Sequence, residues 1–252
     1  MSPIVTGYEK TLDWPLYQGQ PKPYLLATTP RSGSTFLSHL LWQTGCLGAP
    51  LEYLNFEATG PFGSASGLPD RQAAVWEHVV AHRTSPNGIF GMKAFPLQME
   101  VLGSQNLSLL TRTMRFLLGK GPGSRVVQLR RRDEIAHAIS LARASLSGIW
   151  RAEQERGEDS DPIYSAHMVK RARRELAAQD EAWAQMCREM GITPLVLWYE
   201  DVVASPTDAV AAVADYLSVA LDPAAEIEVP RIRQQSQSGA REWRQQYEGG
   251  SD

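Results

Sequence analysis

A short polar turn, PRSGST at residues 30–35, is the stretch of this sequence best suited to bind an anion. A glycine allows close approach of the backbone to a ligand, and an arginine is a planar, permanent cation that suits phosphate or sulfate oxygens. A helical pattern follows directly, and the first N–H groups and the dipole of a helix favour a bound anion. The turn therefore predicts an anion-binding loop made of Arg31, Ser32, Gly33, Ser34 and Thr35.

The loop lacks the features that hold a nucleoside triphosphate with Mg²⁺. In the motif G-x-x-x-x-G-K-[ST] the lysine contacts the transferred phosphate and the hydroxyl binds Mg²⁺, and here both the first glycine and the lysine are missing. A P-loop kinase using ATP and Mg²⁺ is still an alternative, because Glu200 and Asp201 end an apolar segment where a metal-binding pair would lie. A nucleotide-binding protein without catalytic activity is a second alternative.

A second anion site is predicted where another apolar run ends. The segment VVQLRRRDEIAHAIS, residues 126–140, places three consecutive arginines after a strand and Ser140 on the following helix. Adjacent strand residues point to opposite faces, so the three arginines cannot all contact one ligand. Two anion sites at the edge of one sheet indicate a ligand with two separated phosphates.

A carboxylate in the next loop is a candidate general base. Glu52, in GAPLEYLNF, lies just beyond the first helical segment, and Glu57 competes with it for this role. Partial burial of a carboxyl group raises its pKa toward that of a usable base. Lys93 ends the apolar run GIFGMKA and is a further candidate for the same site.

Apolar periodicity predicts strands that alternate with helices, which is typical of a parallel sheet with helices on both faces. The expected fold class is α/β, a P-loop-like three-layer fold with a central, mostly parallel sheet. Ligands bind beyond the carboxyl ends of such strands, where the candidate residues lie. Residues 1–23 are expected to be a loosely packed leader, and residues 24–252 a single domain. The strands are expected at 24–28, 88–94, 125–131 and 193–201, and the helices at 34–44, 71–83, 107–119, 134–147, 165–191 and 205–217.

Composition restricts the partners and the compartment. The chain has 252 residues and a net charge of −3, so no general basic field favours nucleic acid or a membrane surface. Two widely spaced cysteines fit a reducing compartment. No signal peptide and no membrane span are predicted, and we expect a cytoplasmic protein. His78 and His82 have metal-ligand spacing without a third ligand, so no metal is expected.

Several motifs occur in an order that resembles the bacterial trehalose sulfotransferase family, a branch of the sulfotransferases that use 3′-phosphoadenosine 5′-phosphosulfate (PAPS). The resemblance covers residues 24–247 and implies a sulfotransferase-like domain, with PAPS as the co-substrate. The two phosphates of this donor would account for two anion sites. The motifs are PRSGSTFL, GAPLEYL, FGMKAF, RRRDEIAHAISLARA, SGIW, YEDVV and RQQSQSGAREWRQQY.

The resemblance assigns the donor and the catalytic residues. It implies that Arg31–Thr35 bind the 5′-phosphosulfate, and that Arg131 or Arg132 binds the 3′-phosphate together with Ser140. Arg31 would stabilise the departing phosphate oxygens. Glu52 matches the acidic residue that acts as catalytic base in the family segment G-E-P-x-E-[FY]-F.

The resemblance also implies roles outside the two anion sites. Arg233, in a C-terminal segment that also carries Trp243, would help to close over the nucleotide. Tyr53 and Lys93 join Glu52 as candidate acceptor-binding residues. The departures from the family pattern lie on the acceptor side, where Ala49 replaces the first glutamate of G-E-P-x-E. The expected reaction is sulfuryl transfer to a hydroxyl of a carbohydrate, glycolipid or similar small molecule, without a metal; relatives suggest a homodimer.

Overall fold

A single parallel sheet forms the centre of the protein. The computed structural model describes residues 6–57, 60–150, 154, 162–231 and 238–250. In this part of the chain the sheet contains four strands in the order β2-β1-β3-β4, and each neighbouring pair is parallel. The strands are β1 (Lys22–Ala27), β2 (Ile89–Ala94), β3 (Arg125–Arg130) and β4 (Leu195–Trp198).

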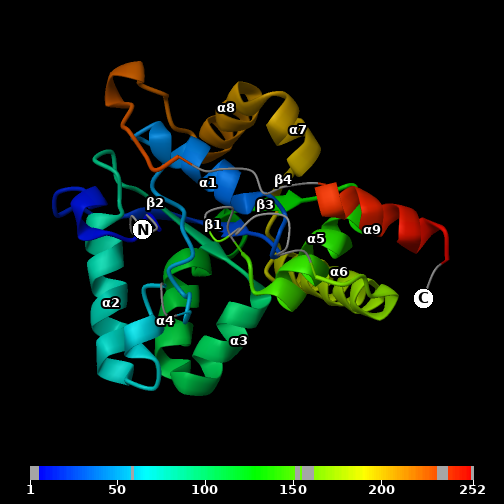
Figure 1. The fold of residues 1–252 in the computed structure, drawn as a ribbon. Helices are drawn as coiled ribbons and strands as arrows, with labels where there is room; N and C mark the ends of the chain where they lie inside the picture. Colours follow the sequence, from blue (N-terminus) through cyan, green and yellow to red (C-terminus); the bar gives the residue numbers. More distant parts are fainter. Residues whose placement is uncertain (1–5, 58–59, 151–153, 155–161, 232–237, 251–252) are drawn as a thin grey trace.

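Helices cover both faces of the sheet and produce three layers (Figure 1). One face is covered by α1 (Ser34–Gln43), α7 (Tyr199–Ala204) and α8 (Pro206–Leu217). The other face packs against α2 (Pro69–His82), α3 (Pro96–Gln105), α4 (Leu107–Leu118) and α6 (Ala166–Glu189). Two further helices, α5 (Glu134–Ser147) and α9 (Ser238–Glu248), pack with α6 in a third cluster. The described residues also form short 3-10 turns at Lys10–Leu12, Gly63–Ala65, Gly121–Gly123 and Pro223–Ala225.

The strands β1, β2 and β3 are mainly apolar because most of their residues are buried on both faces of the sheet, whereas β4 is only partly buried. In β1, Leu25 and Ala27 pack in the cluster with α2, α4 and α6, whereas Tyr24 and Leu26 pack in the cluster with α1 and α8. This division follows from the alternation of side chains along a strand. The predicted α/β class and the parallel, three-layer architecture are confirmed.

One prediction along the chain is wrong, and one helix was not anticipated. The fourth strand ends at Trp198, and Tyr199 begins α7, so Glu200 and Asp201 lie in the first turn of a helix rather than at the end of a strand. The unanticipated helix is α3, which begins at Pro96. Its apolar residues do not follow a clear helical period, and only Leu102 is fully buried.

The described part of the predicted leader makes specific contacts with α2 and with Arg83 at its end. Arg83, which is 2 % exposed, donates to the carbonyl oxygens of Gly7 (2.9 Å) and Glu9 (3.0 Å) and pairs with Asp13 at 2.8 Å. Two histidines of α2 also contact the leader: His78 pairs with Asp13, and His82 forms a hydrogen bond with the Trp14 carbonyl. The leader is therefore fixed to α2.

Candidate active site at the carboxyl ends of the strands

The predicted anion-binding loop lies between β1 and α1. Arg31 (φ 65°) and Gly33 (φ 83°) both adopt left-handed backbone conformations, and Gly33 is the residue before the first turn of α1. The first N–H groups of a helix have no acceptor within the helix. Ser34 and Thr35 occupy that first turn. The loop thus has the arrangement that binds anions in other strand–turn–helix units.

Gly33 is required by two separate features of the loop. Its φ of 83° disfavours a side chain, and a Cβ atom at this position would lie 2.2 Å from Cδ2 of Tyr199. The Tyr199 ring also lies against the guanidinium of Arg131, with Cζ 4.9 Å from the ring centroid. A side chain at Gly33 would therefore displace the Tyr199 ring, which contacts the guanidinium of Arg131.

We expect Gly33→Ala to weaken both folding and donor binding. Gly148→Ala is the matched control, because Gly148 has a similar φ of 69° but no described atom within 4 Å of an added Cβ. The left-handed conformation alone costs about 1–2 kcal/mol. Chemical denaturation should show a larger loss for Gly33→Ala, and calorimetry should show an affinity for 3′-phosphoadenosine 5′-phosphate (PAP) lower by about tenfold or more. Equal losses in both variants would contradict the role given to Tyr199.

A buried histidine of α5 forms a hydrogen bond with the anion-binding loop. His137 is 4 % exposed, and its Nε2 atom lies 2.8 Å from the carbonyl oxygen of Pro30. Burial is the main cause that lowers the pKa of His137 to about 4; the nearby cations Arg131 and Arg31 act in the same direction, and the Pro30 hydrogen bond opposes them. The imidazole is therefore neutral at pH 7, and its N–H donates to Pro30.

This histidine makes the stability of the fold depend on pH. Below the ordinary pKa of 6.5 the unfolded chain binds a proton at His137, whereas the folded protein does not until about pH 4. The free energy of unfolding should therefore decrease as the pH falls through this window, by about 3 kcal/mol from this group. Denaturation of His137→Gln between pH 7 and pH 4 should show a flatter dependence than wild type. His167→Gln, at an exposed position, should follow wild type.

The structure brings Arg31 next to Ser140 of the second predicted anion site. Arg31 Nε donates to Ser140 Oγ at 3.2 Å, and Nη1 donates to the Trp150 carbonyl at 2.6 Å. Nη1 of Arg131 lies 3.4 Å from the carbonyl oxygen of Arg31. Both predicted anion sites thus adjoin at the ends of β1 and β3.

Arg132 points to α7 instead. Its guanidinium bonds to both carboxylate oxygens of Asp201 at 2.6 Å. Glu200 accepts the backbone N–H groups of Arg132 (3.1 Å) and Asp133 (3.2 Å). Burial alone would raise the pKa of Glu200, but these backbone hydrogen bonds lower it below its ordinary value. The hydrogen bond from Arg132 likewise lowers the pKa of Asp201.

The carboxylates that suggested a Mg²⁺ site therefore have partners within the protein. Within the described ranges, no group of three or more histidine, cysteine, aspartate or glutamate side chains is arranged to hold a metal ion. In the same ranges no helix has the length and apolarity needed to cross a bilayer.

The candidate base, Glu52, lies beside the anion-binding loop. Its Oε1 atom is 2.8 Å from Nζ of Lys93, and the same Nζ donates to Oγ1 of Thr35 at 3.1 Å. Lys93 is 2 % exposed, whereas Glu52 is 19 % exposed. A buried cation thus connects a partly accessible carboxylate to the first turn of α1.

Backbone pairing places Glu52 next to Lys93. Leu51 forms an isolated parallel bridge with Met92, and the Lys93 N–H donates to the Leu51 carbonyl at 3.0 Å. The hydroxyl of Tyr8 donates to the Glu52 carbonyl at 3.3 Å from the leader. The loop after α1 therefore follows β2 as an additional edge segment.

The other candidates of this loop differ in burial. Glu57 is exposed. Tyr53 is 1 % exposed, donates its hydroxyl to the Ala49 carbonyl, and stacks on Phe90 with ring centroids 6.0 Å apart. Tyr53 thus belongs to the apolar core in this structure. Gln98, which was not among the predicted site residues, donates from Nε2 to Glu52 Oε2 at 3.1 Å.

The C-terminal candidates are only partly described. Arg233 lies outside the described residues. Trp243, on α9, is 3 % exposed and packs edge-to-face on Tyr164 in the cluster of α5 and α6. Arg244 pairs with Asp133 at the start of α5 at 2.6 Å. These contacts fix α9 beside the helix that carries Ser140.

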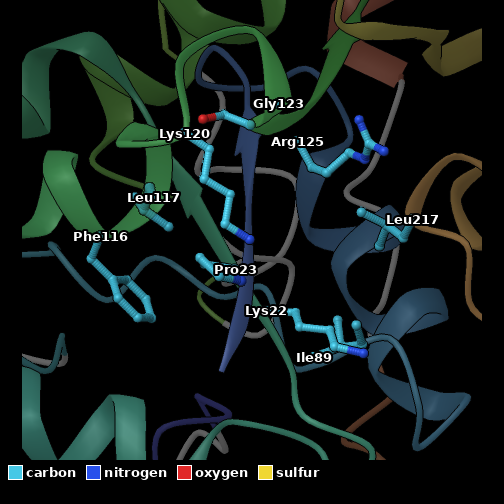
Figure 2. A pocket seen from close by; sticks show the side chains of 10 residues that line it. Lys22, Pro23, Ile89, Phe116, Leu117, Lys120, Gly123, Arg125 and Leu217 are labelled. Carbon is cyan, nitrogen blue, oxygen red and sulfur yellow. The ribbon is translucent and has the colours of Figure 1, made fainter. Parts of the chain in front are cut away.

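Two cavities lie near charged residues of the sheet. One, of about 280 Å³, lies beside the three arginines, whose first and third members flank the ring of Trp198. The other, of about 170 Å³, lies at the amino ends of β1 and β3 and is lined by Lys22, Lys120 and Arg125 (Figure 2). Because the second cavity is at the opposite end of the strands from Glu52, it is separate from the candidate active site.

Comparisons with known proteins agree with the motifs. The chain is 29 % identical to "Trehalose 2-sulfotransferase" of Mycobacterium tuberculosis (strain ATCC 35801 / TMC 107 / Erdman), and the alignment covers 90 % of this chain and 94 % of the relative. It is 24 % identical to the protein of that name from Mycolicibacterium smegmatis (strain ATCC 700084 / mc(2)155), with the same coverage. A solved structure, "Sulfotransferase Domain from the Synechococcus PCC 7002 Olefin Synthase", matches with a TM-score of 0.48 and 17 % identity over 84 % of this chain and 79 % of that chain.

A match to a family model covers nearly the whole chain. The model of the Stf0 sulphotransferase family matches residues 23–249. The matched range contains the anion-binding loop, Glu52, Lys93 and the arginines that follow β3. The resemblance inferred from the motifs and the prediction of a sulfotransferase are confirmed, and the chain belongs to the Stf0 sulphotransferase family.

Proposed function

We propose that this protein transfers a sulfuryl group from PAPS to a hydroxyl of a carbohydrate or similar small molecule, with Glu52 as the general base. The observation that carries this proposal is the position of Lys93 between Glu52 Oε1 and Thr35 Oγ1. It puts a carboxylate within reach of the loop that would hold the sulfuryl donor. Transfer of a sulfuryl group to an alcohol needs this pairing of an anion site with a proton acceptor.

The donor would lie across the adjoining anion sites. Residues 31–35 would hold the 5′-phosphosulfate through the loop N–H groups, the hydroxyls and Arg31. Arg131 is our choice for the 3′-phosphate together with Ser140, because its guanidinium approaches the loop. Of the described residues, none forms an ion pair with Arg131, whereas Arg132 is engaged by Asp201. Arg233 would complete the donor site.

The reaction would proceed by in-line displacement at sulfur. The bond between sulfur and the phosphate oxygen breaks as a bond to the acceptor oxygen forms, and Glu52 takes the proton of the acceptor hydroxyl. PAP is the leaving group. By analogy with phosphoryl transfer we expect a loose transition state, so that catalysis depends on positioning and on charge stabilisation by Arg31 and the loop N–H groups. These donors supply the stabilisation without a metal ion.

The names of the relatives suggest trehalose as the first acceptor to examine. The protein would be incubated with PAPS and trehalose, then with other saccharides and glycolipids, in the presence of EDTA, and the products analysed by mass spectrometry. We expect a product heavier by one sulfuryl group, formed at the same rate with and without EDTA. Formation of PAP with no sulfated product from any acceptor, or a requirement for Mg²⁺, would contradict the proposal.

A further inference from the structure

The side-chain amide of Gln98 is fixed at both ends. Gln98 occupies the third position of α3, where its Oε1 accepts the N–H of Phe95, the residue before the helix, at 3.2 Å. Its Nε2 donates to Glu52 Oε2 at 3.1 Å. If the amide were rotated by half a turn, its oxygen would face Glu52 Oε2 and its N–H group would face the N–H of Phe95. Only one orientation therefore satisfies both partners.

Gln98 and Lys93 together hold the carboxylate of Glu52. Lys93 contacts Oε1 at 2.8 Å, and Gln98 contacts Oε2 at 3.1 Å, so each oxygen has a separate partner from a different element. An ionised carboxylate has about four acceptor positions, so both oxygens can still accept a further hydrogen bond. The two contacts restrict rotation of the side chain while leaving the 19 % exposed carboxylate accessible.

We propose that Gln98 is a positioning residue that fixes the orientation of Glu52 and couples it to the start of α3. This inference rests on the proposed role of Glu52 as the base. The reacting hydroxyl must meet the carboxylate in a defined geometry, and small errors in position are costly for turnover. A neutral N–H donor is suited to this task because it binds the ionised carboxylate without adding a second acid.

The variant Gln98→Glu separates this role from the role of Gln98 in folding. Glutamate at the third helical position can accept the N–H of the residue before the helix as glutamine does, so the start of α3 is preserved. The same change replaces the N–H donor with a carboxylate oxygen facing Glu52 Oε2. Two carboxyl groups in contact cannot both ionise easily, so their titrations become coupled and one pKa rises.

The direct test is an NMR titration of protein labelled with ¹³C at the glutamate carboxyl groups, with the Glu52 signal assigned by its loss in Glu52→Gln. In Gln98→Glu we expect the carboxyl signal of Glu52 to report the coupled titration of the two carboxyl groups, with a step at higher pH that wild type lacks. Ser108→Glu is the control, because it adds the same charge at an exposed position in the first turn of α4. Superimposable Glu52 titrations in wild type and Gln98→Glu would overturn the inference.

Kinetics provide a second test that distinguishes the inference from the proposed function. Gln98→Met removes the donor without adding charge, and we expect kcat to fall about tenfold with an unchanged KM for PAPS. In Gln98→Glu the loss should diminish at higher pH, which a purely structural defect would not produce. Unaltered kcat in both variants, together with inactive Glu52→Gln, would refute the role of Gln98 alone. Active Glu52→Gln would instead refute the base that Gln98 is proposed to position.

Discussion

Replacing Glu52 with glutamine should lower kcat by about 10²-fold or more while leaving the affinity for PAP close to that of wild type. A general base that is correctly placed contributes about 10²–10⁴-fold to the rate, and the amide cannot accept the proton of the acceptor. The donor site should persist, because the loop from Arg31 to Thr35 belongs to other elements. Single-turnover rates with PAPS and isothermal titration with PAP measure the two quantities separately.

The control for this variant comes from the same loop. Glu57→Gln makes the identical chemical change at an exposed carboxylate, and its kcat should equal that of wild type. Because Glu52→Gln also leaves Lys93 without its carboxylate, a loss of stability is expected, as for any buried ion pair with one partner removed. The double variant Glu52→Gln/Lys93→Met should recover stability but not turnover. Near wild-type turnover in Glu52→Gln, or a large loss in Glu57→Gln, would remove Glu52 from the role of base.

Removing the guanidinium of Arg31 is expected to have a comparable effect for a different reason. Arg31→Ala should lower kcat/KM for PAPS by about 10²–10³-fold, the loss typical of deleting one donor to the charge that develops in a transition state. Alanine is as disfavoured as arginine at a φ of 65°, so the backbone strain of the loop is little changed. Initial rates at varied PAPS concentration provide the measurement.

Arg31→Lys tests whether charge alone is sufficient. A lysine keeps the positive charge but loses the planar fork that donates to Ser140 Oγ and the Trp150 carbonyl, so we expect only a small part of the activity to return. Arg71→Ala, at an exposed position on α2, should behave as wild type. Full recovery in Arg31→Lys would show that the geometry of the guanidinium is unimportant.

Local patterns in the sequence were sufficient to predict the sheet and the anion-binding loop. Each strand is an apolar run bounded by turns, and the loop at residues 30–35 combines a strand, a glycine and a helix start within one short segment. These signals are local, so a single sequence carries them. The same reasoning placed Glu52 and Lys93 among the candidates, because Glu52 follows the first helical segment and Lys93 lies near the end of a strand, at the edge where parallel sheets bind ligands.

Contacts between segments far apart in the chain could not be predicted from the sequence. The pairing of Leu51 with Met92, which brings Glu52 to Lys93, depends on tertiary structure and has no local pattern. Gln98 was missed because α3 has a weak apolar period, although proline and glutamine at its first and third positions are a helix-start signal. The engagement of Arg132 by Asp201 similarly depends on how β3 meets α7.

The binding of PAP, with ATP and Mg²⁺ as the comparison, tests whether PAPS is the donor. PAP at about 100 times its Kd should raise the free energy of unfolding by about 2.7 kcal/mol, and titration calorimetry should give a stoichiometry of one per chain. We expect that PAP stabilises the protein, that ATP with Mg²⁺ does not, and that Arg31→Ala and Arg131→Ala each weaken the effect. Stabilisation by ATP with Mg²⁺ but not by PAP would contradict the proposed donor.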